Sequence, residues 1–475
     1  MSPSAGGGGT CCKVRVDLAN PYERSDAVID ATALLFDAKA AHCIDTTGVL
    51  ASVLASSPGR MLGRGVGEKI WGATFGGREF ALKTQCADLE HAELADADTE
   101  PYLRLLAAEA RINEYLTRRL LGVHKPWLAR CPHFVAAYAY ELTPVVPACV
   151  RGKMQSRTLT EQYACVMATE CVDMGTAERV LFSVLDPALV DASPLASECT
   201  AFSLIAQTLI AICAMAACGV SHNDLYLANV FATSTEMPVL VYEFPGACIA
   251  TRPRVYLRTF HVLYLVGDFG VASHELWETD GDVRFSETSG ADDSGEDDDA
   301  KTRAGSLHRF YYTSADVVAE RRNGLLTVDA KEKQVHALLY DLSRYERDVA
   351  YFLSNVVTTA QTLGESARRV VSFARVLLDE FDVPGRLKDA AQLVDITQRV
   401  LSRDFVAGHF GTRTAAAFFF NADEVDAFTH VYALPSRNEA LLMRADVHAL
   451  LNKPVAPHSL VRVVDGGGAP TTTFS

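Results

Sequence analysis

Residues 221–230 read SHNDLYLANV, and residues 266–270 read VGDFG. The first stretch sets His222, Asp224 and Asn229 at the spacing H-x-D-x-x-x-x-N, directly after a long apolar run. The second stretch places Asp268 after LYLV, which is typical of a buried strand. Together they predict two neighbouring loops whose side chains can accept a proton or bind a metal ion through oxygen.

These residue types suit phosphoryl transfer, which needs a group to take up the proton of the attacking hydroxyl and oxygen ligands for Mg²⁺. Asp224 would take the proton, and Asn229 and Asp268 would hold Mg²⁺ on the nucleotide phosphates. Either motif recurs by chance. Their occurrence together, in this order, favours a kinase.

Residues 61–83, MLGRGVGEKIWGATFGGREFALK, predict a glycine-rich hairpin followed by a strand. Gly63 and Gly65 form a turn whose backbone N–H groups can approach phosphates, and Ile70 stands where the returning strand begins. Ala81 and Lys83 lie on the next strand, from which the lysine can pair with the α- and β-phosphates. We expect these five residues to bind nucleotide. Glutamate replaces the third glycine of G-x-G-x-x-G, so an ordinary surface hairpin is the competing interpretation.

Residues 102–121 predict an amphipathic helix. On it, Glu109 is placed to reach inward and pair with Lys83. Glu114 is the alternative partner, and a solvent-facing position for both glutamates is the remaining interpretation.

Residues 131–140 read as a strand, and residues 170–175 (ECVDMG) read as a connector that follows a second strand. The connector's backbone, chiefly at Glu170 and Val172, would hydrogen-bond to adenine. Thr169 would lie at the back of that pocket.

Composition bounds the classes of function. The 475 residues are 49% apolar and 22% charged, as in a soluble globular protein with a sizeable core. The net charge of −15 argues against nucleic-acid binding and suits basic or neutral protein partners.

Cysteine spacing and apolar runs bear on the location of the protein. Twelve cysteines without zinc or C-x-x-C spacing predict reduced thiols in the cytoplasm, and residues 1–10 do not resemble a secretory signal. The apolar run 202–220 is expected to be a buried helix rather than a membrane span.

The rest of the chain gives weaker signals. Residues 280–305 include the acidic run DDSGEDDD, which is too charged to bury and predicts a disordered insertion. Residues 338–356 predict a helix whose Asp341 or Asp348 braces the backbone of the 221–230 loop. Residues 438–451 predict a further helix in the C-terminal part.

With these residues in place, the order of motifs resembles the eukaryotic protein kinase fold over roughly residues 58–455. The resemblance implies an α+β, bilobal structure. It assigns residues 1–57 to a partly disordered extension, 58–170 to a β-rich N-lobe, 171–465 to a mainly helical C-lobe and 466–475 to a disordered tail. It implies catalytic roles for Asp224, Lys83, Glu109 and Asn229, and Mg²⁺ ligation by Asn229 and Asp268. Residues 309–316 (RFYYTSAD) resemble a degenerate form of the segment that ends in Ala-Pro-Glu.

More narrowly, the chain resembles the divergent serine/threonine kinases of large DNA viruses, including the poxvirus morphogenesis kinase, with the herpesvirus-conserved kinases as neighbours. Two positions depart from the usual pattern. Asn223 replaces the arginine that precedes the catalytic aspartate, so we expect activity without phosphorylation of the activation segment. Tyr226 replaces a lysine near the γ-phosphate, which leaves the hydroxyl specificity open.

The sequence therefore predicts an ATP- and Mg²⁺-dependent serine/threonine protein kinase, with Mn²⁺ as an alternative metal. The predicted partners are ATP and protein substrates, without nucleic acid or a membrane span. The predicted location is the host-cell cytoplasm, with the virion as a second location if the protein is viral. A small-molecule kinase of the aminoglycoside or choline type and a pseudokinase scaffold are the competing hypotheses.

Overall fold

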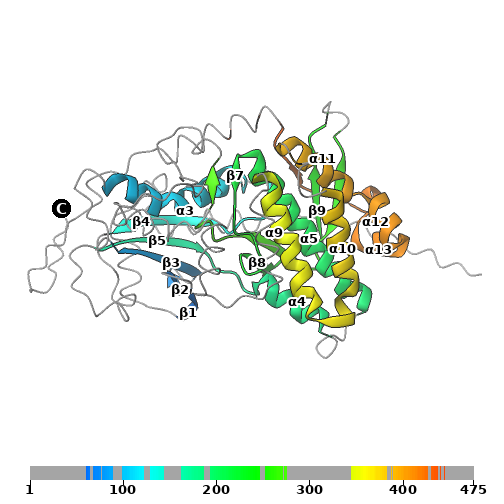
Figure 1. Ribbon diagram of the computed structural model, residues 1–475, viewed down its shortest axis with the longest axis horizontal. Helices are drawn as coiled ribbons and strands as arrows, with labels where there is room; N and C mark the ends of the chain where they lie inside the picture. The colour runs from blue at the N-terminus through cyan, green and yellow to red at the C-terminus, as the bar shows by residue number, and fades with distance from the viewer. Residues whose placement is uncertain are drawn as a thin grey trace, which may run out of the picture.

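The protein has a mixed α+β structure, described here from a computed structural model (Figure 1). The structure describes residues 60–64, 68–75, 78–88, 99–121, 129–143, 162–186, 193–246, 252–270, 272–274, 344–381, 387, 389–425, 429–436, 439 and 443. The predictions for residues 1–57, 280–305, 309–316 and 466–475, and those for Gly65 and Asp341, lie outside this part of the chain.

Five antiparallel strands form the largest sheet, in the order β1-β2-β3-β5-β4. The strands are β1 Met61–Arg64, β2 Glu68–Phe75, β3 Arg78–Asp88, β4 Ala137–Thr143 and β5 Gln162–Glu170. Strand β3 is central, so Lys83 is paired with Ile70 on one side and with Met167 on the other. The prediction of a strand at residues 131–140 is wrong for its first half. Strand β4 begins only at Ala137, and before it Phe134 forms a single bridge to Val266, outside the large sheet.

Helix α3 (Thr99–Arg119) packs against β4 and β5 and confirms the predicted amphipathic helix. Ala108, Ile112 and Leu116 recur every fourth residue and are buried, so this face turns toward the protein interior. Every residue from Ala108 to Thr117 is buried, Glu109 included, so this part of α3 is enclosed on all sides.

Helix α5 (Pro194–Ala217) is the core of the helical part. Ser193 caps its N-terminus through its hydroxyl, and Pro194 occupies the first turn, where no amide hydrogen is needed. It is the one helix within the described residues that is long and apolar enough to cross a membrane, yet its apolar window is 100% buried inside the protein. Helices α4, α9, α10, α11 and α13 surround it, as the prediction of a buried helix requires.

The other described helices are α4 Ala177–Leu185, α9 Arg344–Gln361, α10 Arg368–Phe381, α11 Ala390–Val400, α12 Arg403–Phe410 and α13 Thr412–Phe418. Figure 1 shows the five-stranded sheet and α3 at one end of the molecule and these helices at the other, with β7 and β8 between them. Of the helix predicted at 438–451, only Glu439 and Met443 lie within the described residues.

Short strands lie around the two motif loops. Strands β8 (Val230–Ser234) and β11 (Val262–Val266) pair antiparallel, with Val230 opposite Val266, and β6 (Gly175–Thr176) completes this sheet. Since one motif loop ends where β8 begins and the other starts where β11 ends, the pairing brings them to the same edge. Strands β7 (Val220–Ser221) and β12 (Ser273–His274) pair on the far sides of the two loops.

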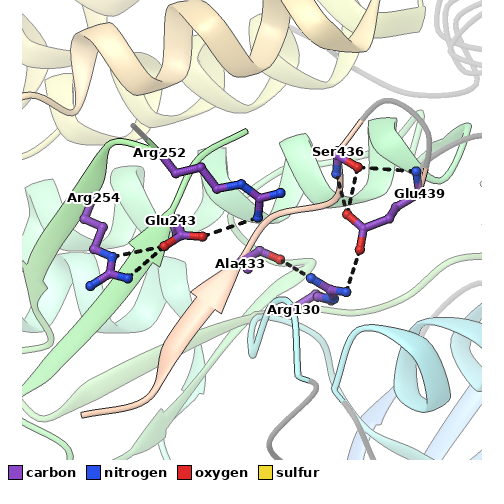
Figure 2. Close-up of polar contacts among 7 residues, drawn as sticks. All are labelled: Arg130, Glu243, Arg252, Arg254, Ala433, Ser436 and Glu439. Atoms are coloured by element: carbon purple, nitrogen blue, oxygen red, sulfur yellow. Dashed lines mark hydrogen bonds and ion pairs between the residues drawn. The ribbon is translucent and has the colours of Figure 1, made fainter. Parts of the chain in front are cut away.

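The connection at residues 235–261 contains a hairpin of β9 (Val239–Glu243) and β10 (Arg254–Arg258), which the sequence analysis did not predict. Strand β13 (Val431–Ala433) lies parallel to β9 and brings the end of the described chain to this hairpin. Figure 2 shows the charged contacts within the hairpin and at the residues that follow β13. They comprise Glu243 with Arg252 and Arg254, and Arg130 with Glu439 and the carbonyl of Ala433, while Ser436 donates to Glu439.

Candidate functional site

The site centres on Lys83, whose ammonium group contacts two carboxylates. Lys83 Nζ lies 2.7 Å from Glu109 Oε1 on α3 and 2.5 Å from Asp268 Oδ1 in the VGDFG loop. Lys83 is 7% exposed and Glu109 is 6% exposed, so this contact is shielded from water. The side chain of Asp268 is 39% exposed, so its contact with Lys83 is the more accessible of the two. Through these two ion pairs Lys83 connects the sheet, α3 and the loop.

The two carboxylates differ in their affinity for a proton. Burial raises the pKa of Glu109, and the positive charge of Lys83 only partly opposes this shift. Burial acts in the same direction on Asp268, but the charge and hydrogen bond of Lys83 outweigh it and leave the pKa of Asp268 lowered. Asp268 is therefore the carboxylate that holds its negative charge more firmly.

The predicted pairing of Lys83 with Glu109, rather than with Glu114, is confirmed. Glu114 instead forms an ion pair of 2.9 Å with Arg118 one turn further along α3. Both glutamates are buried, so the third interpretation, in which they face solvent, is wrong.

Asp224 and Asn229 lie together on the loop between β7 and β8. Asn229 Nδ2 donates to the backbone carbonyl of Asp224 at 2.8 Å and to its Oδ2 at 3.3 Å. Asn229 is buried and Asp224 is half-buried, so the aspartate is the more accessible of the two. These contacts fix the position of the Asp224 carboxylate against the loop.

Backbone contacts join this loop to the VGDFG loop. The amide of Gly267 donates to the carbonyl of Asn229 at 3.0 Å, and His222 Nε2 lies 3.0 Å from the carbonyl of Gly267. Since a carbonyl oxygen only accepts, Nε2 is the protonated nitrogen of this imidazole. Phe269 is buried with its ring centroid 5.2 Å from that of His222, which adds an apolar contact between the loops.

Asp348 on α9 braces the first loop from behind. Its Oδ2 accepts from the amide of His222 at 2.7 Å, and its Oδ1 accepts from the amide of Asn223 at 2.8 Å. Burial raises the pKa of Asp348, and the two amide donors oppose that shift. The prediction that Asp341 or Asp348 braces this loop is thus confirmed for Asp348.

Backbone shape at the site depends on three residues. Asn223 and Asp268 have φ values of 64° and 63°, and asparagine and aspartate are among the side chains that tolerate this left-handed region best. A Cβ on Gly267 would lie 2.9 Å from Val135 Cγ2 and 3.0 Å from the ring of Phe231. Glycine is therefore required directly before Asp268, a constraint that the sequence analysis did not single out.

Strand pairing brings the described nucleotide-binding candidates of the large sheet onto neighbouring strands. Gly63 on β1 pairs with Ile70 on β2, and Ala81 on β3 is buried two residues before Lys83. Thr169 is buried and donates through Oγ1 to the carbonyl of Ala81 at 3.3 Å.

At the connector, the amide of Glu170 donates to the carbonyl of Ala136 at 2.9 Å and is engaged within the protein. Hydrogen bonding to adenine by Glu170 would therefore fall to its carbonyl oxygen. Val172 is half-buried and packs on the main core.

No family model matches the chain, and no curated protein matches it either. The functional argument therefore depends on the residues and their geometry.

Proposed function

We propose that this protein is an ATP-dependent protein kinase that transfers the γ-phosphoryl group to serine or threonine hydroxyls. The observation that carries the proposal is the position of Lys83 between Glu109 and Asp268, at distances of 2.7 and 2.5 Å. A lysine held this way presents a fixed positive charge beside the loop that bears Asp268, where nucleotide phosphates would lie. Asp224 lies on the loop that contacts the VGDFG loop through Gly267, so the proposed proton acceptor and the lysine are held by two connected loops.

In the proposed reaction, Asp224 takes up the proton of the attacking hydroxyl, and its contact with Asn229 orients the carboxylate. Lys83 binds the α- and β-phosphates, and Glu109 prevents its ammonium group from moving into solvent. Most of the rate enhancement would come from positioning, because phosphoryl transfer requires little covalent participation by the protein.

Asn229 and Asp268 would hold the metal ion. Their amide and carboxylate oxygens suit Mg²⁺, which keeps several waters and binds to proteins through one or two side chains plus phosphates. The lowered pKa of Asp268 keeps this ligand ionised. When bound, Mg²⁺ would neutralise charge on the phosphates, and Mn²⁺ would serve as the alternative ion.

The same proposal covers the architecture and the biological setting. The sheet with α3 would form the N-lobe (58–170) and the helices the larger C-lobe (171–465) of a bilobal kinase. A viral serine/threonine kinase, acting on proteins in the host cytoplasm or packaged in the virion, remains the narrower proposal and is supported only by the motifs described above.

The test is transfer of labelled γ-phosphate from ATP with Mg²⁺ to a basic generic protein and to the chain itself. Wild-type protein should label serine or threonine, and Asp224→Ala should lower the rate about a hundredfold or more. Asp395→Ala, at an exposed position on α11, is the matched control and should keep the wild-type rate. Equal rates in wild type and Asp224→Ala would exclude the assigned mechanism.

Two other outcomes would select the competing functions. Transfer to aminoglycosides or choline, without protein labelling, would identify a small-molecule kinase. If ATP raises the melting temperature without any transfer, the protein is a pseudokinase scaffold.

A further inference from the structure

Strand β11 leads directly into Asp268, because its last residue is Val266 and only Gly267 lies between them. One edge of β11 pairs with β8, and no other strand of the described chain continues the sheet at the second edge. The N–H and C=O groups of a buried strand edge need partners. At β11 these partners come from the side chain of Gln207 and from residues 133–135.

Gln207 on α5 binds the first half of this edge. Its Nε2 donates to the carbonyl of Val262 at 3.1 Å and to Ser203 Oγ at 2.9 Å. Its Oε1 accepts from the amide of Tyr264 at 2.9 Å. Gln207 is fully buried, so these contacts attach the start of β11 to the central helix of the helical part.

His133 binds the second half of the same edge and is fully buried. Its backbone carbonyl accepts from the amide of Val266 at 2.8 Å, and its Nδ1 lies 2.8 Å from the carbonyl of Tyr264. Because a carbonyl oxygen only accepts, Nδ1 is the protonated nitrogen. Nε2 of the neutral ring is then an acceptor, and it contacts the hydroxyl of Tyr242. This hydroxyl therefore favours the tautomer in which His133 donates to β11.

Tyr242 belongs to the β9–β10 hairpin, outside both motif loops. It pairs with Val255 on β10 and with Tyr432 on β13, so the three-stranded sheet fixes its place. Its ring centroid lies 5.8 Å from that of His133 and 5.7 Å from that of Tyr432. Burial raises the pKa of Tyr242 well above its ordinary value of 10, so the hydroxyl keeps its proton and remains a donor.

We propose that Tyr242 is a positioning residue for Asp268, acting through His133 and β11. The hydroxyl holds the imidazole in the orientation that donates to β11. The same histidine binds the amide of Val266, two residues before Asp268, through its backbone. The hairpin thereby belongs to the structure that sets the place of the Asp268 loop, although none of its residues lies in that loop.

Close packing leaves little room to absorb a shift of residues 133–135. A Cβ on Gly267 would lie 2.9 Å from Val135 Cγ2, so these two residues are already in tight contact. Protein interiors of this density transmit a displacement rather than take it up. A movement of His133 therefore reaches the backbone directly before Asp268. Its consequence for catalysis rests on the proposed function of Asp268 as a metal ligand, whereas the contacts themselves do not.

The first test measures hydrogen exchange of backbone amides in Tyr242→Phe, which removes the hydroxyl and keeps the ring. Peptides that cover residues 262–270 should exchange about fivefold faster or more than in wild type, while those of α10 keep the wild-type rate. Tyr256→Phe, at a half-buried position on β10 of the same hairpin, is the matched control and should change neither segment. Unchanged exchange at 262–270, or equal acceleration in 262–270 and α10, would overturn the proposal, because the second result shows a general loss of stability.

A double-mutant cycle tests whether Tyr242 acts through His133. An asparagine amide nitrogen lies as many bonds from the backbone as Nδ1 does, so His133→Asn keeps a donor for Tyr264 and loses the reach to Tyr242. Tyr242→Phe should accelerate exchange at 262–270 in the wild-type background and add nothing in the His133→Asn background. The same acceleration in both backgrounds would show that Tyr242 acts by another route and would overturn the proposal.

Turnover gives the readout that a merely structural role would not produce. Tyr242→Phe should lower kcat about tenfold and raise the Mg²⁺ concentration for half-maximal rate, because misplaced metal ligands weaken transition-state stabilisation. The KM for the protein acceptor should stay unchanged, and Tyr256→Phe should keep both kinetic parameters. An unchanged kcat in Tyr242→Phe would overturn its role in the reaction. If wild type transfers no phosphate, the proposed function fails, while the exchange measurements still decide whether Tyr242 positions the Asp268 loop.

Discussion

Replacement of Asp348 by asparagine tests how the Asp224 loop is held. The buried carboxylate accepts two backbone amides, from His222 at 2.7 Å and from Asn223 at 2.8 Å. Asparagine keeps one acceptor oxygen, but its NH₂ group replaces the second. One of the two backbone amides then faces another donor and loses its hydrogen bond. A hydrogen bond to a charged acceptor contributes about 1.5–3 kcal/mol, and a buried donor left unsatisfied costs about 1–3 kcal/mol. We therefore expect Asp348→Asn to lower the free energy of unfolding by about 2–4 kcal/mol.

Urea unfolding at neutral pH measures this change, with an unchanged dependence on urea showing that both proteins unfold from comparable states. The control is Asp379→Asn on α10, an exposed aspartate that removes the same charge. It should change the stability by less than about 0.5 kcal/mol. If Asp348→Asn falls within that limit too, the two amide contacts do not stabilise the loop and the argument for the brace fails.

Three further changes test other parts of the site. Gly267→Ala should destabilise the protein by about 1–3 kcal/mol in urea unfolding because its Cβ has no room, whereas Gly408→Ala, with nothing within 4 Å, should not. Glu109→Gln should lower phosphoryl transfer about tenfold or more because Lys83 loses a charged partner, while Glu114→Gln on the same helix should keep the rate. Burial lowers the pKa of His430 to about 4, so protons favour the unfolded chain and stability should fall as the pH drops below the ordinary value of 6.5. This loss is at most about 1.4 kcal/mol per pH unit, and urea unfolding between pH 7 and pH 5 should show a flatter profile in His430→Gln. The glycine argument fails if Gly267→Ala is as stable as Gly408→Ala, and the glutamate argument fails if Glu109→Gln and Glu114→Gln lose the same activity. The histidine argument fails if wild type and His430→Gln lose stability equally between pH 7 and pH 5.

The contacts predicted from the sequence are those that short-range patterns determine. The position of Glu109, three residues before the apolar Ile112, predicted that it faces inward and pairs with Lys83, and the structure shows this pairing. The same pattern left Glu114 open as the partner, and Glu114 is also buried but pairs with Arg118. Strand-like LYLV directly before the Asp268 loop likewise placed that loop at the end of a buried strand, β11. In both cases a local apolar pattern predicted which segment is buried.

Other features depend on tertiary packing and have no local signal. Arg347 meets Asn223 because α9 passes behind the loop, and no periodicity links positions 124 residues apart. The requirement for glycine at position 267 comes from Val135 and Phe231, which belong to different segments. The first half of the predicted strand at 131–140 reads apolar, as a strand does, but pairs with β11 through Phe134 rather than within the large sheet.

The two loops form one unit because contacts at Gly267 connect them. Each loop also holds one residue, Asn223 or Asp268, in a backbone region that is costly for most side chains. Such conformations persist only when surrounding contacts determine them, at a cost on the order of 1–3 kcal/mol each. For Asn223 the determining contact is Asp348, and for Asp268 it is Lys83 together with the close packing at Gly267. His222 and Asn229 then connect the loops through the backbone of Gly267. A change that releases either left-handed residue should therefore disturb both loops, so Asp348→Asn should also weaken the response of the protein to Mg²⁺ and ATP, although Asp348 itself belongs to neither loop.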